Sequence, residues 1–190
     1  MTTRRDFLKT MTMASAGLAL GTGDLLGAPI SVSQRKAAAD KVKIAYVGIG
    51  NRGEQIIGDF ARTGMVEVVA LCDVDMGAPH TQKVMNMYPK AKRFRDFRQM
   101  FDKAGNDFDA VAIATPDHSH FPITMLALAS GKHVYVEKPL ARTFYEAELL
   151  MQAALKRPNL VTQVGNQGHS EANYFQFKAW MDAGIIKDVT

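Results

Sequence analysis

The chain has 190 residues, of which 47% are hydrophobic and 22% charged, so it has the composition of a globular domain and too many apolar residues for a disordered chain. Its single cysteine, Cys72, excludes an internal disulfide and any zinc site built from several cysteines. The formal net charge of +4 lies in residues 1–43, where seven Lys/Arg outnumber three Asp/Glu, whereas residues 44–190 carry sixteen of each. The folded part therefore lacks the basic excess that attracts phosphate backbones, and we expect no nucleic-acid partner.

A signal sequence is predicted at the N-terminus. Arg4 and Arg5 precede Phe-Leu-Lys and a weakly apolar run of eleven residues from Met11 to Gly21. This pattern resembles the bacterial twin-arginine signal, which a translocase reads as an address, although Thr3 stands where Ser is more usual. The run is shorter than the roughly 20 residues that span a bilayer, so no stable membrane span is expected.

We therefore interpret residues 1–40 as signal peptide and linker, with the twin-arginine translocase as partner during export and the periplasm as destination. A disordered, basic N-terminus of a cytosolic protein is the alternative.

Short runs of β-forming residues alternate with segments of helical periodicity from residue 41 onward. Strands are predicted at 42–47, 66–71, 92–94, 110–114, 133–136 and 161–164, and a seventh is expected to begin at Val189. Helices are predicted at 51–62, 79–87, 96–104, 120–129, 143–155 and 170–182, with capping residues at Asp96 and Thr143. Continuous apolar strands joined by helices predict an α/β fold, a doubly wound parallel sheet with helices on both faces.

A glycine-rich motif follows the first predicted strand and opens a predicted helix. Gly48-Ile-Gly-Asn-Arg-Gly53 has the spacing G-x-G-x-x-G. Gly48 permits a tight turn, Gly50 lets a pyrophosphate approach the backbone, and Gly53 lets the helix pack closely on the strand. The helix N-terminus offers free N–H groups and a partial positive charge to phosphates.

Asp73 lies twenty residues after Gly53, just past the second predicted strand. An acidic side chain there accepts hydrogen bonds from the adenosine ribose hydroxyls and repels a 2′-phosphate, which favours NAD over NADP. A glycine-rich turn and a helix-capping aspartate are the alternative interpretation.

Polar residues also follow the later predicted strands. Thr115-Pro-Asp-His-Ser-His120 contains two histidines and an aspartate without a complete ligand set, so no metal is expected and helix capping is an equally good explanation. Glu137-Lys-Pro139 ends the fifth strand, where Lys138 can face a bound substrate because the carboxyl ends of parallel strands line the ligand crevice. An ordinary surface lysine is the alternative. Gly165-Asn-Gln-Gly-His169 ends the sixth strand, and its histidine can equally be a capping or solvated residue.

These motifs together resemble the N-terminal half of the glucose–fructose oxidoreductase/inositol dehydrogenase/MocA family. The matching stretches, in order within residues 40–190, are IAYVGIGNRG, CDVD, AIATPDHSHF, GKHVYVEKPLA and TQVGNQGHS. The resemblance implies a Rossmann domain followed by a large antiparallel substrate domain, and hydride transfer between NAD(P) and a sugar or cyclitol carbon. It also implies that Lys138 is catalytic beside the nicotinamide and the substrate, and that Pro116 and His120 line the nicotinamide pocket.

The cofactor-binding residues that we predict are Gly48, Gly50, Asn51, Arg52, Gly53, Asp73, Thr115, Pro116, His120, Glu137, Lys138 and Gln163. The family's acid/base histidine lies in its second domain and has no counterpart up to Thr190. We therefore expect residues 41–190 to be the NAD(P)-binding domain, ending where a substrate domain would begin, and the full-length protein to be a homo-oligomer. Two alternatives stay open: a redox-neutral NAD-dependent glycosidase of the same fold, and an inactive nucleotide-binding module. Against the glycosidase, Asn166-Gln-Gly-His169 replaces the paired arginines typical of those enzymes.

Replacing both Arg4 and Arg5 by lysine is expected to leave the precursor in the cytoplasm, because the twin-arginine receptor reads the pair. Immunoblotting of cytoplasmic and periplasmic fractions measures the distribution, with Arg35→Lys as a matched control outside the motif. Normal periplasmic accumulation of the double variant would contradict the export prediction.

Overall fold

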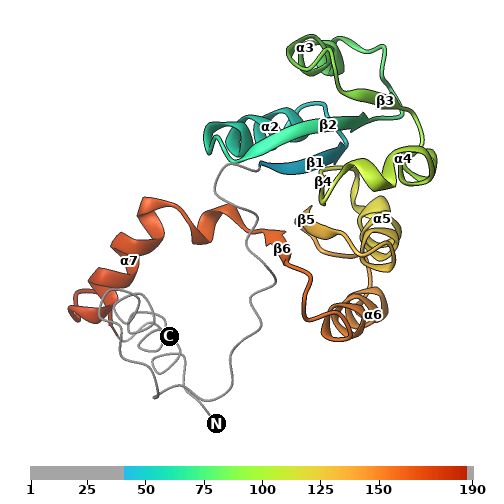
Figure 1. The fold of residues 1–190 in the computed structure, drawn as a ribbon. Coiled ribbons are helices and arrows are strands. Elements are labelled where there is room, and N and C mark those ends of the chain that lie inside the picture. The colour runs from blue at the N-terminus through green and yellow to red at the C-terminus, as the bar shows by residue number, and fades with distance from the viewer. Residues whose placement is uncertain (1–40, 188–190) are drawn as a thin grey trace, which may run out of the picture. The chain divides into compact units, whose positions relative to one another are not determined.

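The computed structural model describes residues 41–187, which form a six-stranded sheet with helices on both faces (Figure 1). The strands are β1 (Val42–Val47), β2 (Val66–Cys72), β3 (Lys92–Phe94), β4 (Ala110–Ile113), β5 (His133–Glu137) and β6 (Thr162–Gly165). The helices are α2 (Arg52–Arg62), α3 (Pro79–Met87), α4 (Phe97–Ala104), α5 (Asp117–Ala129), α6 (Phe144–Leu155) and α7 (Ala172–Asp182), with short 3-10 turns η1 (Gly105–Asp107) and η2 (Gln167–His169). The predicted leader, 1–40, and Val189 lie outside the described residues.

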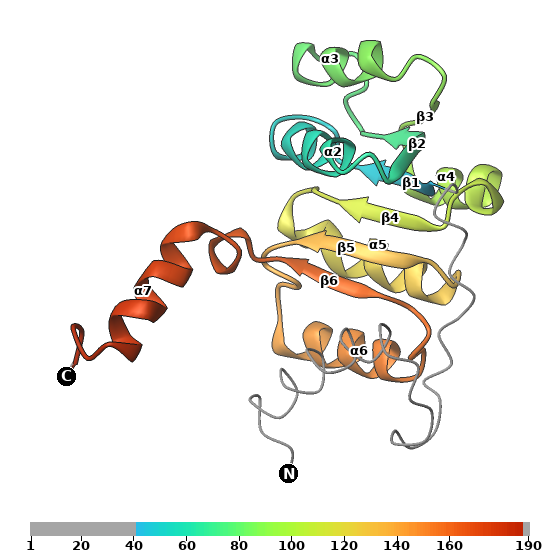
Figure 2. The ribbon, with the colours of Figure 1, turned by 60° about the vertical axis from the view of Figure 1, so that its left-hand side comes forward.

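The strand order creates a crevice at one edge of the sheet. All neighbouring strands are parallel, in the order β3-β2-β1-β4-β5-β6. From β1 the chain moves outward through β2 and β3 and then returns to the other side of β1 to form β4. Helices α2 and α3 cover one face, and α4, α5 and α6 cover the other (Figures 1 and 2). The connections that leave β1 and β4 therefore diverge to opposite faces and open a crevice at the carboxyl ends of the strands. This arrangement confirms the predicted Rossmann-type doubly wound sheet.

The central strands are buried on both faces, which explains why their sequences are continuously apolar. In β1, Ile44 and Tyr46 pack with the buried isoleucines of α2, whereas Ala45 and Val47 pack with the core under α4 and α5. Each of these four residues, 44–47, is at most 3% exposed. A strand that fills two cores has no polar face, as expected for a parallel sheet covered on both sides.

Local capping sets several helix starts. The Asp96 carboxylate accepts a hydrogen bond from the N–H of Arg98, and Thr143 and Glu146 form a reciprocal capping box at α6. Helix α5 begins at Asp117, three residues before the predicted start at 120. The extended backbone of Pro116 occupies the N-cap position, and the Asp117 carboxylate stands in the first turn, where the helix dipole favours negative charge.

Helix α7 lies outside the two layers that cover the sheet (Figure 2). None of its residues is buried, and the side chains of Phe175, Phe177 and Met181 are 60%, 49% and 50% exposed. Within residues 41–187, no helix combines the length and the apolar character needed to cross a membrane.

Gly53 and Gly58 lie in the same helix but in different surroundings. A Cβ at Gly53 would collide with the carbonyl oxygen of Gly48, whereas a Cβ at Gly58 would meet only the Arg62 Nη1, at 4.0 Å. We expect Gly53→Ala to lower the free energy of unfolding by about 3 kcal/mol through overpacking. Gly58→Ala should raise it by about 0.5–1 kcal/mol, because alanine favours the helix. Urea denaturation followed by circular dichroism measures both, and equal destabilisation by the two variants would contradict the assigned packing.

Candidate functional site

The turn between β1 and α2 packs directly against the end of β4. Gly48 has φ +80°, and a Cβ on it would lie 2.5 Å from the carbonyl oxygen of Ala114. A Cβ on Gly53 would likewise collide with the carbonyl oxygen of Gly48 within the turn. Asn51 has φ +47° and makes no side-chain cap, so the first turn of α2 begins uncovered. The structure therefore supports the predicted steric roles of Gly48 and Gly53.

The N-terminus of α2 presents free amide groups at the crevice. The N–H of Gly53 donates to the Gly50 carbonyl at 2.8 Å, but the N–H groups of Asn51 and Arg52 have no acceptor among residues 41–187. The first N–H groups of any helix lack an intrahelical partner, and together with the helix dipole they form an anion-binding site.

Asp73 ties the end of β2 to this turn. Its Oδ2 accepts a hydrogen bond from the N–H of Ile49 at 2.9 Å, and its Oδ1 accepts one from the N–H of Asp75 at 3.0 Å. A carboxylate offers about four lone-pair sites, so these two bonds leave acceptor capacity for a ligand hydroxyl. The Asp73 side chain, the predicted ribose-binding group, therefore lies beside the turn, and two backbone N–H groups fix its orientation.

Two cavities flank the turn, and both are lined by Ala114 and Thr115 at the end of β4. The first, of about 580 Å³, lies toward β2 and β3. The second, of about 430 Å³, lies toward β5. The buried hydroxyl of Thr115 has no hydrogen-bond partner among the described residues. A ligand with two polar halves joined by an anionic linker would fit this arrangement, with the linker at the N-terminus of α2.

Most of the predicted site residues line one of these two cavities. The first cavity is lined by Gly48, Gly50, Asn51, Asp73 and Pro116, and the second by Arg52, His120, Glu137 and Lys138.

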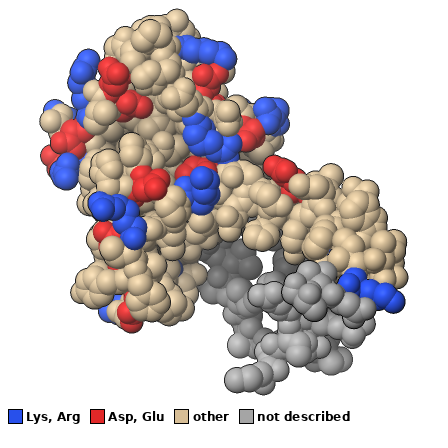
Figure 3. Space-filling model, turned by 180° about the vertical axis from the view of Figure 1, so that it is seen from behind, with Lys and Arg blue, Asp and Glu red and all other residues tan. Residues whose placement is uncertain are grey.

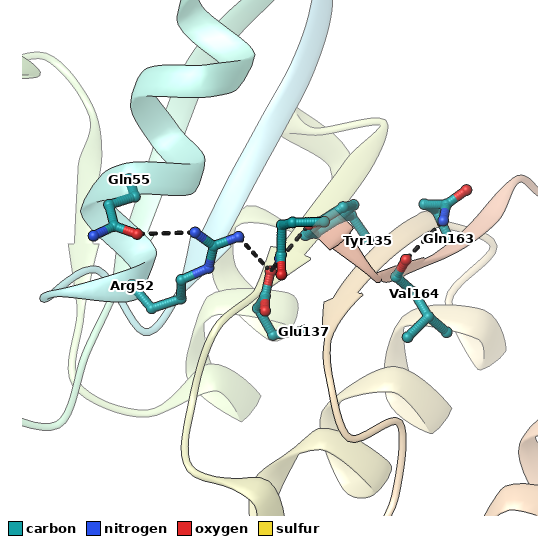
Figure 4. Close-up of polar contacts among 7 residues, drawn as sticks. Arg52, Gln55, Tyr135, Glu137, Gln163 and Val164 are labelled. Atoms are coloured by element: carbon teal, nitrogen blue, oxygen red, sulfur yellow. Dashed lines mark hydrogen bonds and ion pairs between the residues drawn. The ribbon is translucent and has the colours of Figure 1, made fainter. Parts of the chain in front are cut away.

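Glu137 is the centre of the polar network in the second cavity (Figure 4). Its Oε1 accepts hydrogen bonds from Arg52 Nη2 at 3.1 Å, Tyr135 Oη at 3.0 Å and Gln167 Nε2 at 2.5 Å. The Glu137 side chain is only 6% exposed. Burial alone raises the pKa of this carboxyl, but the hydrogen bonds from Gln167, Arg52 and Tyr135 outweigh it and hold the pKa below its ordinary value. Glu137 is therefore a buried, ionised carboxylate.

The network continues on both sides of Glu137. The Nη1 of Arg52 donates to Gln55 Oε1 at 2.8 Å, which holds the guanidinium between α2 and β5. Burial and the hydrogen bond to Glu137 raise the pKa of Tyr135. A Cβ at Gly165 on β6 would lie 2.5 Å from the hydroxyl of Tyr135, so only glycine leaves room for the network there.

His120 positions the segment that carries Lys138. The ring is 1% exposed, with Nδ1 at 2.6 Å from the carbonyl oxygen of Pro139 and Nε2 at 2.8 Å from that of Thr115. The imidazole therefore joins the loop after β4 to the loop after β5. Lys138 forms no ion pair with a described residue, so its ammonium remains available in the second cavity.

Gln163 does not join the other predicted residues. It lies on β6, where its amide donates to the carbonyl oxygen of Val164 at 2.7 Å, apart from the Arg52–Glu137 contact (Figure 4). It lines a separate, apolar cavity between α5, α6 and β6.

His80, Arg95 and Phe97 also line the first cavity, although no sequence pattern had predicted them there. A Cβ at Gly50 would collide with the His80 ring, a contact that no local pattern indicates. Arg95 follows β3 directly, so the rule that carboxyl ends of strands line the crevice would have found it.

The surface of the sheet domain carries mixed charge (Figure 3) and no cluster of metal ligands among residues 41–187. Lys/Arg and Asp/Glu alternate over the face shown in Figure 3, without a large region of one sign on the sheet domain. Within residues 41–187, no group of three or more His, Cys, Asp or Glu side chains is arranged to hold a metal ion.

Comparison with known proteins identifies similar sequences over the same region. The family model described as "Oxidoreductase family, NAD-binding Rossmann fold" (GFO_IDH_MocA) matches residues 42–165. Inositol 2-dehydrogenase of Salmonella typhimurium is 31% identical over 147 residues, which cover 76% of this chain and 43% of the relative. A glycosyl hydrolase family 109 protein of Shewanella pealeana is 31% identical over 167 residues, 80% of this chain and 36% of the relative. The chain thus spans less than half the length of these relatives.

Solved structures share the fold. The structure of scyllo-inositol dehydrogenase from Lactobacillus casei, with bound NAD(H) and scyllo-inositol, matches with a TM-score of 0.68 and 29% identity. The match covers 80% of this chain and 44% of that chain.

Proposed function

Because the chain belongs to the Gfo/Idh/MocA oxidoreductase family and contains its NAD-binding Rossmann domain, we propose that this crevice binds NAD and that the whole protein transfers hydride between NAD and a carbon of a sugar or cyclitol. One observation carries the proposal: the uncapped N-terminus of α2 stands between a cavity that contains Asp73 and a cavity that contains Lys138. The order of a carboxylate, a helix end suited to anions and a cation supports a dinucleotide as the ligand of this crevice.

The residues present fit that cofactor. The free N–H groups of Asn51 and Arg52 suit the pyrophosphate, and the remaining lone pairs of Asp73 suit the adenosine ribose hydroxyls. The unpartnered Thr115 hydroxyl lies where the two halves of the ligand would meet. The Asp73 carboxylate would repel a 2′-phosphate, so we propose NAD rather than NADP.

Bound NAD would supply the hydride acceptor. The chain's own contribution to the chemistry is the Lys138 ammonium, which can donate a hydrogen bond to a substrate hydroxyl and stabilise the alkoxide that develops as hydride leaves. His120 holds the loop that carries this lysine, through the carbonyl oxygens of Pro139 and Thr115. A proton acceptor for the substrate hydroxyl is expected from a second domain.

The relatives support the substrate class. Inositol 2-dehydrogenase is among the similar sequences, and the Lactobacillus casei structure contains scyllo-inositol. We propose a polyhydroxylated ring, a sugar or a cyclitol, as substrate.

A redox-neutral glycosidase is the second candidate. It is favoured by the similarity to the glycosyl hydrolase family 109 protein, which covers 80% of this chain. Such an enzyme would oxidise a sugar carbon transiently, eliminate the glycosidic bond and return the hydride to the product. Soluble NAD(H) is scarce outside the cytoplasm, so a retained cofactor that regenerates itself would suit an exported protein.

Export to the periplasm by the twin-arginine pathway is part of the proposal and rests on Arg4 and Arg5. That pathway carries folded proteins, so the domain could take up NAD before it leaves the cytoplasm.

The choice of cofactor is tested by Asp73→Ser. The loss of a hydrogen bond with a charged partner costs about 1.5–3 kcal/mol, so NAD affinity should fall about ten- to a hundredfold and the preference over NADP should narrow. Isothermal titration calorimetry with both cofactors measures this. Asp102→Ser, an exposed change on α4 away from both cavities, is the matched control. Unchanged discrimination between NAD and NADP in Asp73→Ser would count against the assignment.

The chemistry is tested on a protein that includes the substrate domain, incubated with NAD and a panel of sugars, cyclitols and glycosides. Net NADH formation is expected, and Lys138→Met should lower kcat about a hundredfold or more, by analogy with the removal of one oxyanion donor. Binding of the adenosine and pyrophosphate portions of the cofactor should change little, since the helix N-terminus and Asp73 hold them.

Glycoside cleavage without net NADH would favour the second candidate, and the absence of both reactions would favour an inactive module. If Lys138→Met abolished NAD binding while circular dichroism showed a retained fold, the lysine would be a cofactor ligand, not a catalytic group.

A further inference from the structure

The second cavity holds an unequal number of positive and negative side chains. Arg52 and Lys138 are cations and Glu137 is an anion, so these three side chains together carry a net charge of +1. Glu137 forms its ion pair with Arg52, at 3.1 Å, which leaves the Lys138 charge without a counterion among the described residues.

The two oxidation states of the cofactor differ in charge at the end that would enter this cavity. The oxidised nicotinamide ring carries one positive charge, and hydride addition, which brings a proton and two electrons, makes it neutral. A cavity with a net positive charge repels the oxidised ring and leaves the reduced ring unaffected. We propose that the charges of Arg52, Glu137 and Lys138 together make the crevice bind NADH more tightly than NAD+. Arg52 favours NADH and Glu137 favours NAD+, and the proposal rests on the proposed NAD site.

Arg52 and Glu137 are suited to this role because each holds a fixed charge at a fixed place. Arginine stays protonated at all relevant pH values, and the three hydrogen bonds to Glu137 Oε1 hold the pKa of that carboxyl below its ordinary value. The Arg52 guanidinium donates to both Gln55 and Glu137, so it cannot leave the cavity without breaking both hydrogen bonds.

The size of the effect follows from exposure. The Arg52 side chain is 36% exposed, so water weakens its interaction with a ring in the cavity. We expect each single charge change to alter the ratio of the NAD+ and NADH dissociation constants about three- to tenfold. By linkage, a tenfold preference for NADH raises the two-electron potential of the bound cofactor by about 30 mV.

The experiment measures the dissociation constants of NADH, NAD+ and ADP-ribose for the purified 190-residue chain, by calorimetry or by NADH fluorescence with competition. ADP-ribose lacks the nicotinamide, so it reports changes in the rest of the site. The variants are Arg52→Gln, Arg52→Lys and Glu137→Gln, and Arg62→Gln in the last turn of α2 is the matched control. The wild-type chain should bind NADH more tightly than NAD+. Arg52→Gln should reduce that preference, Arg52→Lys should restore it, and Glu137→Gln should increase it.

A purely structural role would weaken NADH, NAD+ and ADP-ribose together and leave the ratio unchanged. An unchanged ratio in Arg52→Gln, or tighter binding of NAD+ by the wild-type chain, would overturn the inference. If Glu137→Gln fails to fold, the comparison of Arg52→Gln with Arg52→Lys still shows whether the charge at position 52 sets the preference for NADH. Failure of the wild-type chain to bind either NADH or ADP-ribose would instead refute the proposed function itself.

Discussion

The contact between the turn at residues 48–53 and the end of β4, with no side chain between them, is the constraint on which the rest of the site depends. Gly48 lies against the carbonyl of Ala114, and Gly53 lies against Gly48, so the first turn of α2 is drawn down to the level of the sheet. This position brings the unpaired N–H groups of α2 to the point where the chain connections diverge. A Cβ at either glycine would collide with backbone atoms, so this close approach requires glycine at both positions.

Three side chains then fix the loops around that turn. Asp73 binds the N–H of Ile49, His120 links the loops after β4 and β5, and Glu137 binds Arg52 from the far side. The contacts of Asp73 with Ile49, of His120 with Pro139 and of Glu137 with Arg52 join residues 24, 19 and 85 positions apart in the sequence. A ligand that enters this crevice meets loops that are already ordered, which reduces the entropy cost of binding.

Local patterns in the sequence were sufficient to predict the sheet and the glycine-rich turn at residues 48–53. Apolar runs predicted the strands other than the short β3, which reads Lys-Arg-Phe. Helical spacing and capping residues predicted most helix bounds, and the glycine spacing located the anion-binding helix end. The start of α5 was predicted three residues late, because the polar residues from Thr115 to Ser119 do not show the apolar spacing by which the helix was located.

Contacts between distant segments could not be predicted in the same way. The contact of Arg52 with Glu137 joins residues 85 positions apart and depends on how far α2 leans across β4 toward β5. The contact of His80 with Gly50 depends on the course of the loop before α3. Gln163 was expected with the cofactor residues but lies beside a different cavity, because it stands two residues before the carboxyl end of β6, which lies at the crevice.

The volume next to Gly165 is shared with the side chains of Tyr135 and Glu137. The Glu137 carboxylate and the Tyr135 hydroxyl occupy the volume that a side chain on β6 would need. A side chain at 165 would therefore require both the Glu137 carboxylate and the Tyr135 hydroxyl to move or to be replaced. One missing methyl group on β6 thus couples substitutions on β6 to substitutions on β5.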